Sequence, residues 1–146
     1  MLNKNHGAHL KKSCLLFILP LLLLALFNIQ NAYARENDPP MPVNVYFFWG
    51  DGCPHCAAEK PFLESLVEQY PQVKLHAYEI YYVEKNRELF KEFGTALDFE
   101  PQGVPTTIIG RQYWVGFREE YKTEIEAAIR ACMQDHCEFD PGQVVL

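Results

Sequence analysis

Two cysteines separated by two residues, Cys53 and Cys56, are the residues of this 146-residue chain best placed to do chemistry. They lie in the stretch 49–56, Trp-Gly-Asp-Gly-Cys-Pro-His-Cys, between an apolar run and an amphipathic run. A pair with this spacing at the junction of a strand and a helix is typical of a site that alternates between a dithiol and a disulfide. We therefore expect redox chemistry at these two sulfurs.

The expected helix start explains how the first cysteine would react. Cys53 would lie where backbone N–H groups are unpaired and the helix dipole is positive, which favours the thiolate, the nucleophile of disulfide exchange. Pro54 presets φ at the first helical position, and His55 adds a donor, or a positive charge when protonated, that would tune the thiolate. Cys56, one turn further and more buried, would resolve the mixed disulfide and release the partner.

The flanking sequence predicts the elements that hold this pair. Residues 43–48 form an almost continuous β-prone apolar run, which is typical of a central buried strand. Residues 57–70 carry apolar side chains at helical spacing, with a kink expected at Pro61. The later pattern predicts a strand over 73–82, a helix over 85–97, strands over 106–109 and 112–115, and a helix over 119–133. The order β-α-β-α-β-β-α predicts an α/β fold with a four-stranded mixed sheet flanked by helices, its first two strands parallel and its last two an antiparallel hairpin.

Residues 1–34 have the pattern of a secretory signal peptide. Lys4, Lys11 and Lys12 form a basic start, residues 14–27 are apolar and uncharged, and residues 32–34, Ala-Tyr-Ala, form a small-x-small cleavage site. The apolar run is shorter than the roughly 17–25 residues of a spanning helix, so we expect cleavage before Arg35, with an uncleaved N-terminal anchor as the alternative. Either way the remainder would be exported, to the periplasm or out of the cell, where disulfides persist.

The exported part would be one domain of 112 residues. We expect a flexible lead-in over 35–42, the domain over 43–137 and a C-terminal tail over 138–146. All 19 acidic residues lie in this part together with ten basic ones, which gives a net charge of −9 and argues against a nucleic-acid partner. No dimerisation segment is visible, so we expect a monomer.

Several features resemble the thioredoxin-fold family over about residues 43–132. Besides the Cys-Pro-His-Cys motif, Trp49 lies four residues before the first cysteine and Pro61 eight residues after it. The segment Val104-Pro105-Thr106 resembles the cis-proline segment of the family, which faces the dithiol. The resemblance implies a thioredoxin-like fold in which Val104, Pro105 and Trp49 bind substrate and the cis-proline segment pairs with an extended substrate backbone.

The Pro54-His55 dipeptide and the valine before Pro105 resemble the DsbA-type periplasmic oxidases, whose reduced form is stabilised and whose disulfide is strongly oxidising. The large helical insertion of that group is absent from the sequence. Phe47 stands where the family usually buries a carboxylate, and Glu79 or Asp51 is a candidate replacement. The resemblance therefore implies an exported thiol–disulfide oxidoreductase that uses no organic cofactor.

This enzyme would exchange disulfides with protein thiols, and oxidation is favoured over reduction. A membrane or periplasmic redox partner would regenerate it. A reductase kept reduced by a membrane partner remains open, and so does a thioredoxin-like adaptor whose dithiol is idle.

The remaining cysteines of the exported part, Cys132 and Cys137, are expected to form a structural disulfide. Within one continuous helix their Cα atoms would be further apart than the roughly 7 Å that a disulfide spans, so the helix must end near Met133. A second exchange pair, free thiols and metal binding are the alternatives. The rival function is a non-enzymatic zinc- or copper-binding module that uses Cys53, Cys56, Cys132 and Cys137.

Overall fold

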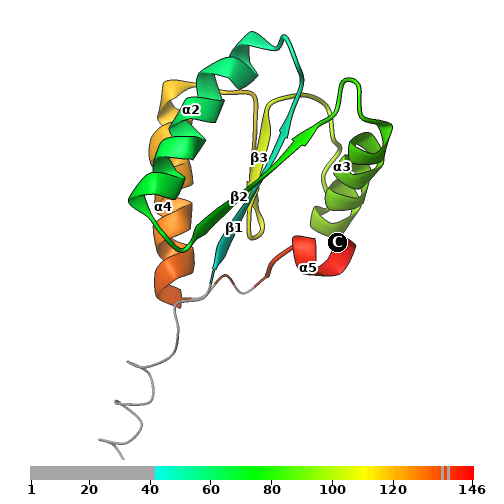
Figure 1. Cartoon of the computed structure of the whole chain (residues 1–146). Helices are drawn as coiled ribbons and strands as arrows, with labels where there is room; N and C mark the ends of the chain where they lie inside the picture. The colour runs from blue at the N-terminus through cyan, green and yellow to red at the C-terminus, as the bar shows by residue number, and fades with distance from the viewer. Residues whose placement is uncertain (1–41, 136, 138) are drawn as a thin grey trace, which may run out of the picture. The chain divides into compact units, whose positions relative to one another are not determined.

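The computed structural model describes residues 42–135, 137 and 139–146 (Figure 1). The expected signal peptide and nearly all of the expected lead-in lie outside the described residues. Within the part that is described, no helix is both long enough and apolar enough to cross a membrane.

The elements follow the predicted order, with one helix added at the C-terminus. They are β1 (Val43–Trp49), α2 (Pro54–Gln69), β2 (Val73–Glu79), α3 (Glu84–Leu97), β3 (Thr106–Ile109), β4 (Gln112–Val115), α4 (Glu119–Asp135) and α5 (Gly142–Val145). Strand β2 ends three residues before the predicted boundary at 82, because the Glu79 side chain accepts hydrogen bonds from the backbone of the residues that follow. Helix α4 runs two residues past Met133.

The sheet has the order β2-β1-β3-β4. Strands β1 and β2 are parallel, in a register that runs from Val43 opposite Val73 to Trp49 opposite Glu79. Strand β3 pairs antiparallel with both β1 and β4. The predicted mixed sheet is confirmed, and the carboxyl ends of β1 and β2 meet at one edge, where the cysteine pair follows β1.

Helices cover both faces of the sheet, which explains why β1 has no polar alternation. Helices α2 and α4 lie on one face and α3 with α5 on the other (Figure 1). Val45 and Phe47 pack into the core under α2 and α4, whereas Phe48 points the other way and contacts Phe90 and Phe93 of α3. The buried side chains of β1 thus pack against helices on both faces of the sheet. This packing holds the strand in place, and the loop that leads to Cys53 starts at its end.

The C-terminal residues are held against the domain at the end of the sheet opposite that loop. Cys132 and Cys137 form a disulfide with a Cα–Cα distance of 4.4 Å, which turns the chain away from α4. Asp140 then accepts hydrogen bonds from Tyr46 Oη and Asn44 Nδ2, both at 2.6 Å. Burial and this carboxylate raise the pKa of Tyr46. Residues 139–146 belong to the stretch expected as a C-terminal tail. They are instead held against the domain, and α5 (Gly142–Val145) contacts α3.

Candidate active site

The Cys53 side chain caps the N-terminus of α2. Its Sγ accepts a hydrogen bond from the backbone N–H of Cys56 at 3.2 Å, the role that a serine or aspartate oxygen usually plays at this position. Pro54 occupies the first turn, where its missing N–H costs no hydrogen bond. Both cysteines are thiols; Cys53 is half-buried, whereas Cys56 is 3 % exposed. The first sulfur is thus accessible to a partner and the second is shielded.

The segment predicted to face the dithiol does so. The Val104–Pro105 peptide bond is cis, and the Val104 carbonyl oxygen lies 3.8 Å from Cys53 Sγ. The hydroxyl of Thr106 donates to the carbonyl of Gly103 at 2.7 Å, and the Pro105 carbonyl accepts from the N–H of Gly116 at 2.8 Å. The loop before β3 is therefore fixed on both sides beside the reactive sulfur.

Cys56 requires a base before it can attack. Burial, followed by its interaction with Cys53, raises the pKa of the Cys56 thiol well above the ordinary value. A thiol that keeps its proton is a poor nucleophile. Resolution of a mixed disulfide therefore depends on a nearby group that takes this proton.

Glu59 is the buried carboxylate that can serve as this base, and the sequence analysis missed it. It lies on α2, one helical turn after Cys56, and is 1 % exposed. Its Oε1 accepts a hydrogen bond from Thr107 Oγ1 at 2.7 Å, and its Oε2 has no hydrogen-bond partner within the described chain. Burial raises the pKa of Glu59 to about 7, although the Thr107 hydrogen bond lowers it, and the Glu59 charge in turn raises the pKa of Cys56.

Neither of the two replacements suggested for the missing carboxylate at Phe47 is buried. Thr107 is the β3 neighbour of Phe47, so Glu59 reaches this part of the core from α2 instead of from β1. Asp51 is exposed in the loop before Cys53. Glu79 is partly exposed, and its carboxylate accepts hydrogen bonds from four backbone N–H groups.

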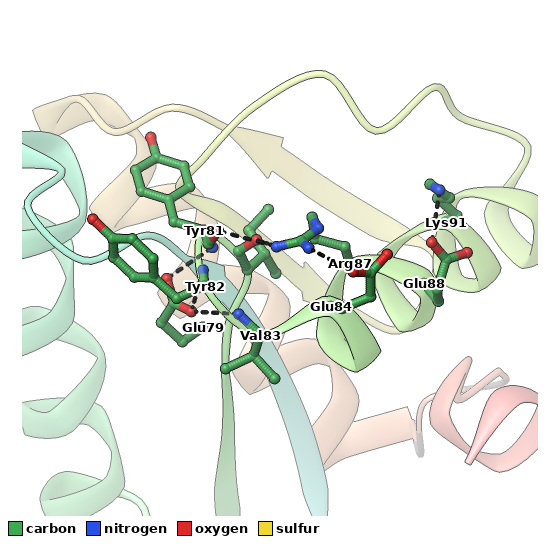
Figure 2. Close-up of polar contacts among 9 residues, drawn as sticks. Glu79, Tyr81, Tyr82, Val83, Glu84, Arg87, Glu88 and Lys91 are labelled. Atoms are coloured by element: carbon green, nitrogen blue, oxygen red, sulfur yellow. Dashed lines mark hydrogen bonds and ion pairs between the residues drawn. The ribbon is translucent and has the colours of Figure 1, made fainter.

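Glu79 has a structural role at the same edge. Its carboxylate binds the N–H groups of Tyr81, Tyr82 and Val83 at 2.8–3.1 Å (Figure 2), and the N–H of Asp51 at 3.3 Å. Desolvation raises the pKa of Glu79, but these donors lower it by more, so the carboxyl stays ionised. Glu79 thereby joins the loop before Cys53 to the segment that follows β2.

Of the other predicted site residues, Trp49 lies beside the cysteines, whereas His55 is exposed. Trp49 lines a depression of about 300 Å³ together with Cys53 and Cys56, and Lys60 Nζ lies 5.3 Å from the centre of its indole. His55 is exposed on the first turn of α2.

The four cysteines do not form one site. Cys132 and Cys137 lie beside Gly110, in the turn after Ile109, which pairs with Val45 near the start of β1. Cys53 follows the other end of that strand. The metal module that needs all four cysteines is therefore wrong, and residues 42–135, 137 and 139–146 contain no group of three His, Cys, Asp or Glu side chains that could hold a metal ion.

Comparisons with known proteins concern the fold alone. Neither a protein-family model nor a curated protein sequence matches the chain. Among solved structures, protein AGR_C_4864 from Agrobacterium tumefaciens aligns with a TM-score of 0.55 at 19% identity, over 67% of this chain and 48% of that one. Mitochondrial thioredoxin 3 from Saccharomyces cerevisiae aligns with a TM-score of 0.48 at 20% identity, over 62% of this chain and 79% of that one. A periplasmic thioredoxin-like protein from Salmonella enterica serovar Typhimurium aligns with a TM-score of 0.46 at 18% identity, over 68% and 93%. The chain has a thioredoxin-like fold.

Proposed function

We propose that this protein is an exported thiol–disulfide oxidoreductase that exchanges disulfides with protein substrates through Cys53 and Cys56. One observation carries the proposal: the half-buried Cys53 sulfur caps α2 and lies 3.8 Å from the carbonyl of Val104 in the cis-proline segment. A hydrogen-bond donor and the helix dipole stabilise negative charge on this sulfur. A fixed loop beside it offers a surface for the substrate backbone.

Exchange proceeds in two steps. The Cys53 thiolate attacks one sulfur of a substrate disulfide, a mixed disulfide forms, and the other substrate sulfur leaves as a thiolate that takes a proton from solvent. Cys56 then attacks the Cys53 sulfur, which forms the Cys53–Cys56 disulfide and releases the first substrate thiolate. The substrate gains two electrons and the protein loses two. The same steps in reverse oxidise a substrate dithiol.

Glu59 takes the proton of Cys56 in the second step. It lies on the same face of α2, one turn away, and its pKa of about 7 allows it both to accept and to return a proton near neutral pH. Its Oε2 is available for this because that oxygen has no partner in the described chain. Thr107 holds the other oxygen and so fixes the carboxylate.

We further propose that the protein works as an oxidant outside the cytoplasm, regenerated by a membrane or periplasmic redox partner. The Pro54-His55 dipeptide and the position of the Cys53 sulfur at the N-terminal cap of α2 support a stable reduced form, and a stable reduced form makes the disulfide oxidising. The signal-like residues 1–34 and the Cys132–Cys137 disulfide both support an oxidising compartment.

The test is the redox equilibrium of the Cys53–Cys56 pair in glutathione buffers, followed by refolding of a reduced, disulfide-containing protein. A reduction potential above about −180 mV together with accelerated disulfide formation would support the oxidase, and a potential near about −270 mV would instead indicate a reductase. Cys53→Ser should abolish exchange. If the variant keeps full activity in refolding and insulin-reduction assays, the dithiol is idle and the proposal fails.

A further inference from the structure

The Cys132–Cys137 disulfide lies at the surface, at the end of the sheet opposite the dithiol. Both cysteines are partly exposed, and they lie beside the turn between β3 and β4. A Cβ atom at Gly110 in this turn would be 3.6 Å from Cys137 Sγ and 4.0 Å from Cys132 Sγ, and glycine leaves that space open. A thiol in solution can therefore approach the bond. Exposed disulfides are the ones that exchange readily, whereas structural disulfides of secreted proteins resist reduction.

The disulfide determines where the chain turns away from α4. In a continuous helix, residues five positions apart have Cα atoms further apart than the roughly 7 Å that a disulfide spans. The Cα–Cα distance is 4.4 Å, and α4 ends at Asp135, two residues before Cys137. The bond thereby directs the residues that follow back toward the sheet. Reduction removes this constraint.

The C-terminal segment 139–146 is anchored by one carboxylate. Asp140 accepts hydrogen bonds from Tyr46 Oη and Asn44 Nδ2, both at 2.6 Å. The N–H of Gly142 donates to the same carboxylate at 3.0 Å. Gly142 also packs on Tyr46 so closely that a Cβ atom would overlap the tyrosine hydroxyl. Docking of the segment therefore requires Asp140 to be held exactly opposite β1.

The apolar side chains of the segment add little to this anchor. Helix α5 has four residues, which are too few to form a stable helix alone. Pro141 is buried and Val145 packs partly buried against the core on the α3 side (Figure 1), but Val144 is 66% and Leu146 70% exposed. Hydrophobic burial therefore contributes little to docking.

The disulfide supplies the remaining restraint. It lies three residues before Asp140 and joins cysteines that are five positions apart in the sequence. A cross-link of this kind limits the conformations that the chain can adopt once the segment has left its site. Because reduction breaks this link, docking of the segment is coupled to the redox state of Cys132 and Cys137.

We propose that Cys132 and Cys137 form a second thiol–disulfide exchange site, and that its reduction releases residues 139–146 from the domain. A thiolate of an external dithiol attacks one sulfur of the pair, and the second thiol of that reductant resolves the mixed disulfide. Cys132 and Cys137 become thiols, so the protein gains two electrons and two protons while the reductant becomes a disulfide. The proposal goes beyond the exchange proposed for the dithiol at the start of α2 and does not depend on it.

The experiment uses the full chain with Cys14→Ser, Cys53→Ser and Cys56→Ser, so that the pair under test supplies the only cysteines. Reducibility is measured without denaturant, with thioredoxin as the dithiol, kept reduced by its reductase and NADPH, whose absorbance gives the rate. Amide hydrogen exchange is then compared between the oxidised protein and the protein reduced with dithiothreitol. The amides of residues 143–146 donate within the C-terminal turn and report release, and those of β1 report whether the domain stays folded.

We expect thioredoxin to reduce the folded protein, and exchange at residues 143–146 to become about 30-fold faster on reduction, equivalent to about 2 kcal/mol. The amides of β1 should stay protected long after residues 143–146 have exchanged. The matched control adds Cys132→Ser and Cys137→Ser. It should exchange like the reduced protein, and dithiothreitol should not change it further.

Three results would overturn the inference. If the disulfide resists thioredoxin until denaturant is added, it is a structural link and not an exchange site. If reduction leaves exchange at residues 143–146 unchanged, the bond does not control docking. If β1 loses its protection together with residues 143–146, the bond stabilises the whole domain instead of one segment. The proposed function fails separately, because its tests follow Cys53, which is absent from the protein used in this experiment.

Discussion

Replacing Glu59 by glutamine should remove a specific pH dependence of stability. The carboxyl is 1% exposed, and burial raises its pKa from the ordinary value of 4.5 to about 7. A carboxyl whose pKa is higher in the folded state keeps its proton longer when folded. Below about pH 4.5 Glu59 is protonated in both the folded and the unfolded protein, and folding carries no cost from its ionisation. As the pH rises from there through about 7, the free energy of unfolding falls, because the unfolded protein releases this proton first.

The size of the effect follows from the two pKa values. Each unit corresponds to about 1.4 kcal/mol, so a shift from 4.5 to about 7 has a maximum effect of about 3 kcal/mol. Between pH 5 and pH 8 the group should lower the free energy of unfolding by about 2.5 kcal/mol. Glutamine does not titrate, so the Glu59→Gln variant should not show this loss. Between pH 5 and pH 8 its free energy of unfolding should therefore rise by about 2.5 kcal/mol relative to that of the unmodified protein.

Urea denaturation of the dithiol form at both pH values measures this difference. All other titrating groups are shared, so they cancel when the two proteins are compared. Glu64→Gln, on the same helix but with an exposed side chain, is the matched control and should follow the unmodified protein. A constant stability difference between Glu59→Gln and the unmodified protein at pH 5 and pH 8 would refute the assignment of Glu59 as a buried group that titrates near neutrality.

Four further outcomes are expected. Glu59→Gln should also slow resolution of a mixed disulfide by Cys56 by about 100-fold or more and remove its rise with pH near 7, as stopped-flow release of a peptide thiol would show. Glu79→Gln removes the negative charge and turns amide hydrogens toward backbone donors, so it should lower the urea midpoint of unfolding; an unchanged midpoint would contradict the role given to the carboxylate. Replacing both Cys132 and Cys137 by alanine opens a short loop and should cost about 2 kcal/mol, while the reactivity of the distant active site is kept; a large loss of that reactivity would contradict their separation. His55→Pro should make the dithiol more reducing in glutathione equilibria, and an unchanged potential would show that His55 does not tune the site.

The features that were predictable from the sequence are those set by local pattern. The apolar run of β1 has to be buried on both faces of the sheet, which predicts a central strand. The residues before Cys53 then have to connect this strand to the next helix, so the sequence predicts the dithiol at the start of that helix. The cis-proline segment depended on the family resemblance, because the contact between Val104 and Cys53 joins residues 51 positions apart. No local pattern encodes such a contact.

Glu59 was missed for a physical reason. A glutamate in an amphipathic helix is usually solvated, and the search for a buried carboxylate was directed at Phe47 on the strand. The signal was nevertheless present: Glu59 precedes Leu63 by four residues and Leu66 by seven, so it lies on the buried face of α2. Helix α5 was missed because it is only four residues long and is held by Asp140, whose partner Tyr46 is 94 residues away.

The two cysteines differ because one helix turn places them in opposite environments. At the cap, the Cys53 sulfur accepts an N–H hydrogen bond and remains accessible to a partner. Three residues further along, the Cys56 thiol is buried, and burial raises its pKa. A pKa of about 7 allows Glu59 to accept and to return the Cys56 proton near neutral pH, so in the proposed mechanism it would speed exchange in both directions. The direction is set by the relative stability of the dithiol and disulfide forms, which is why the reduction potential, and not the rate of exchange, is the measurement that separates an oxidase from a reductase.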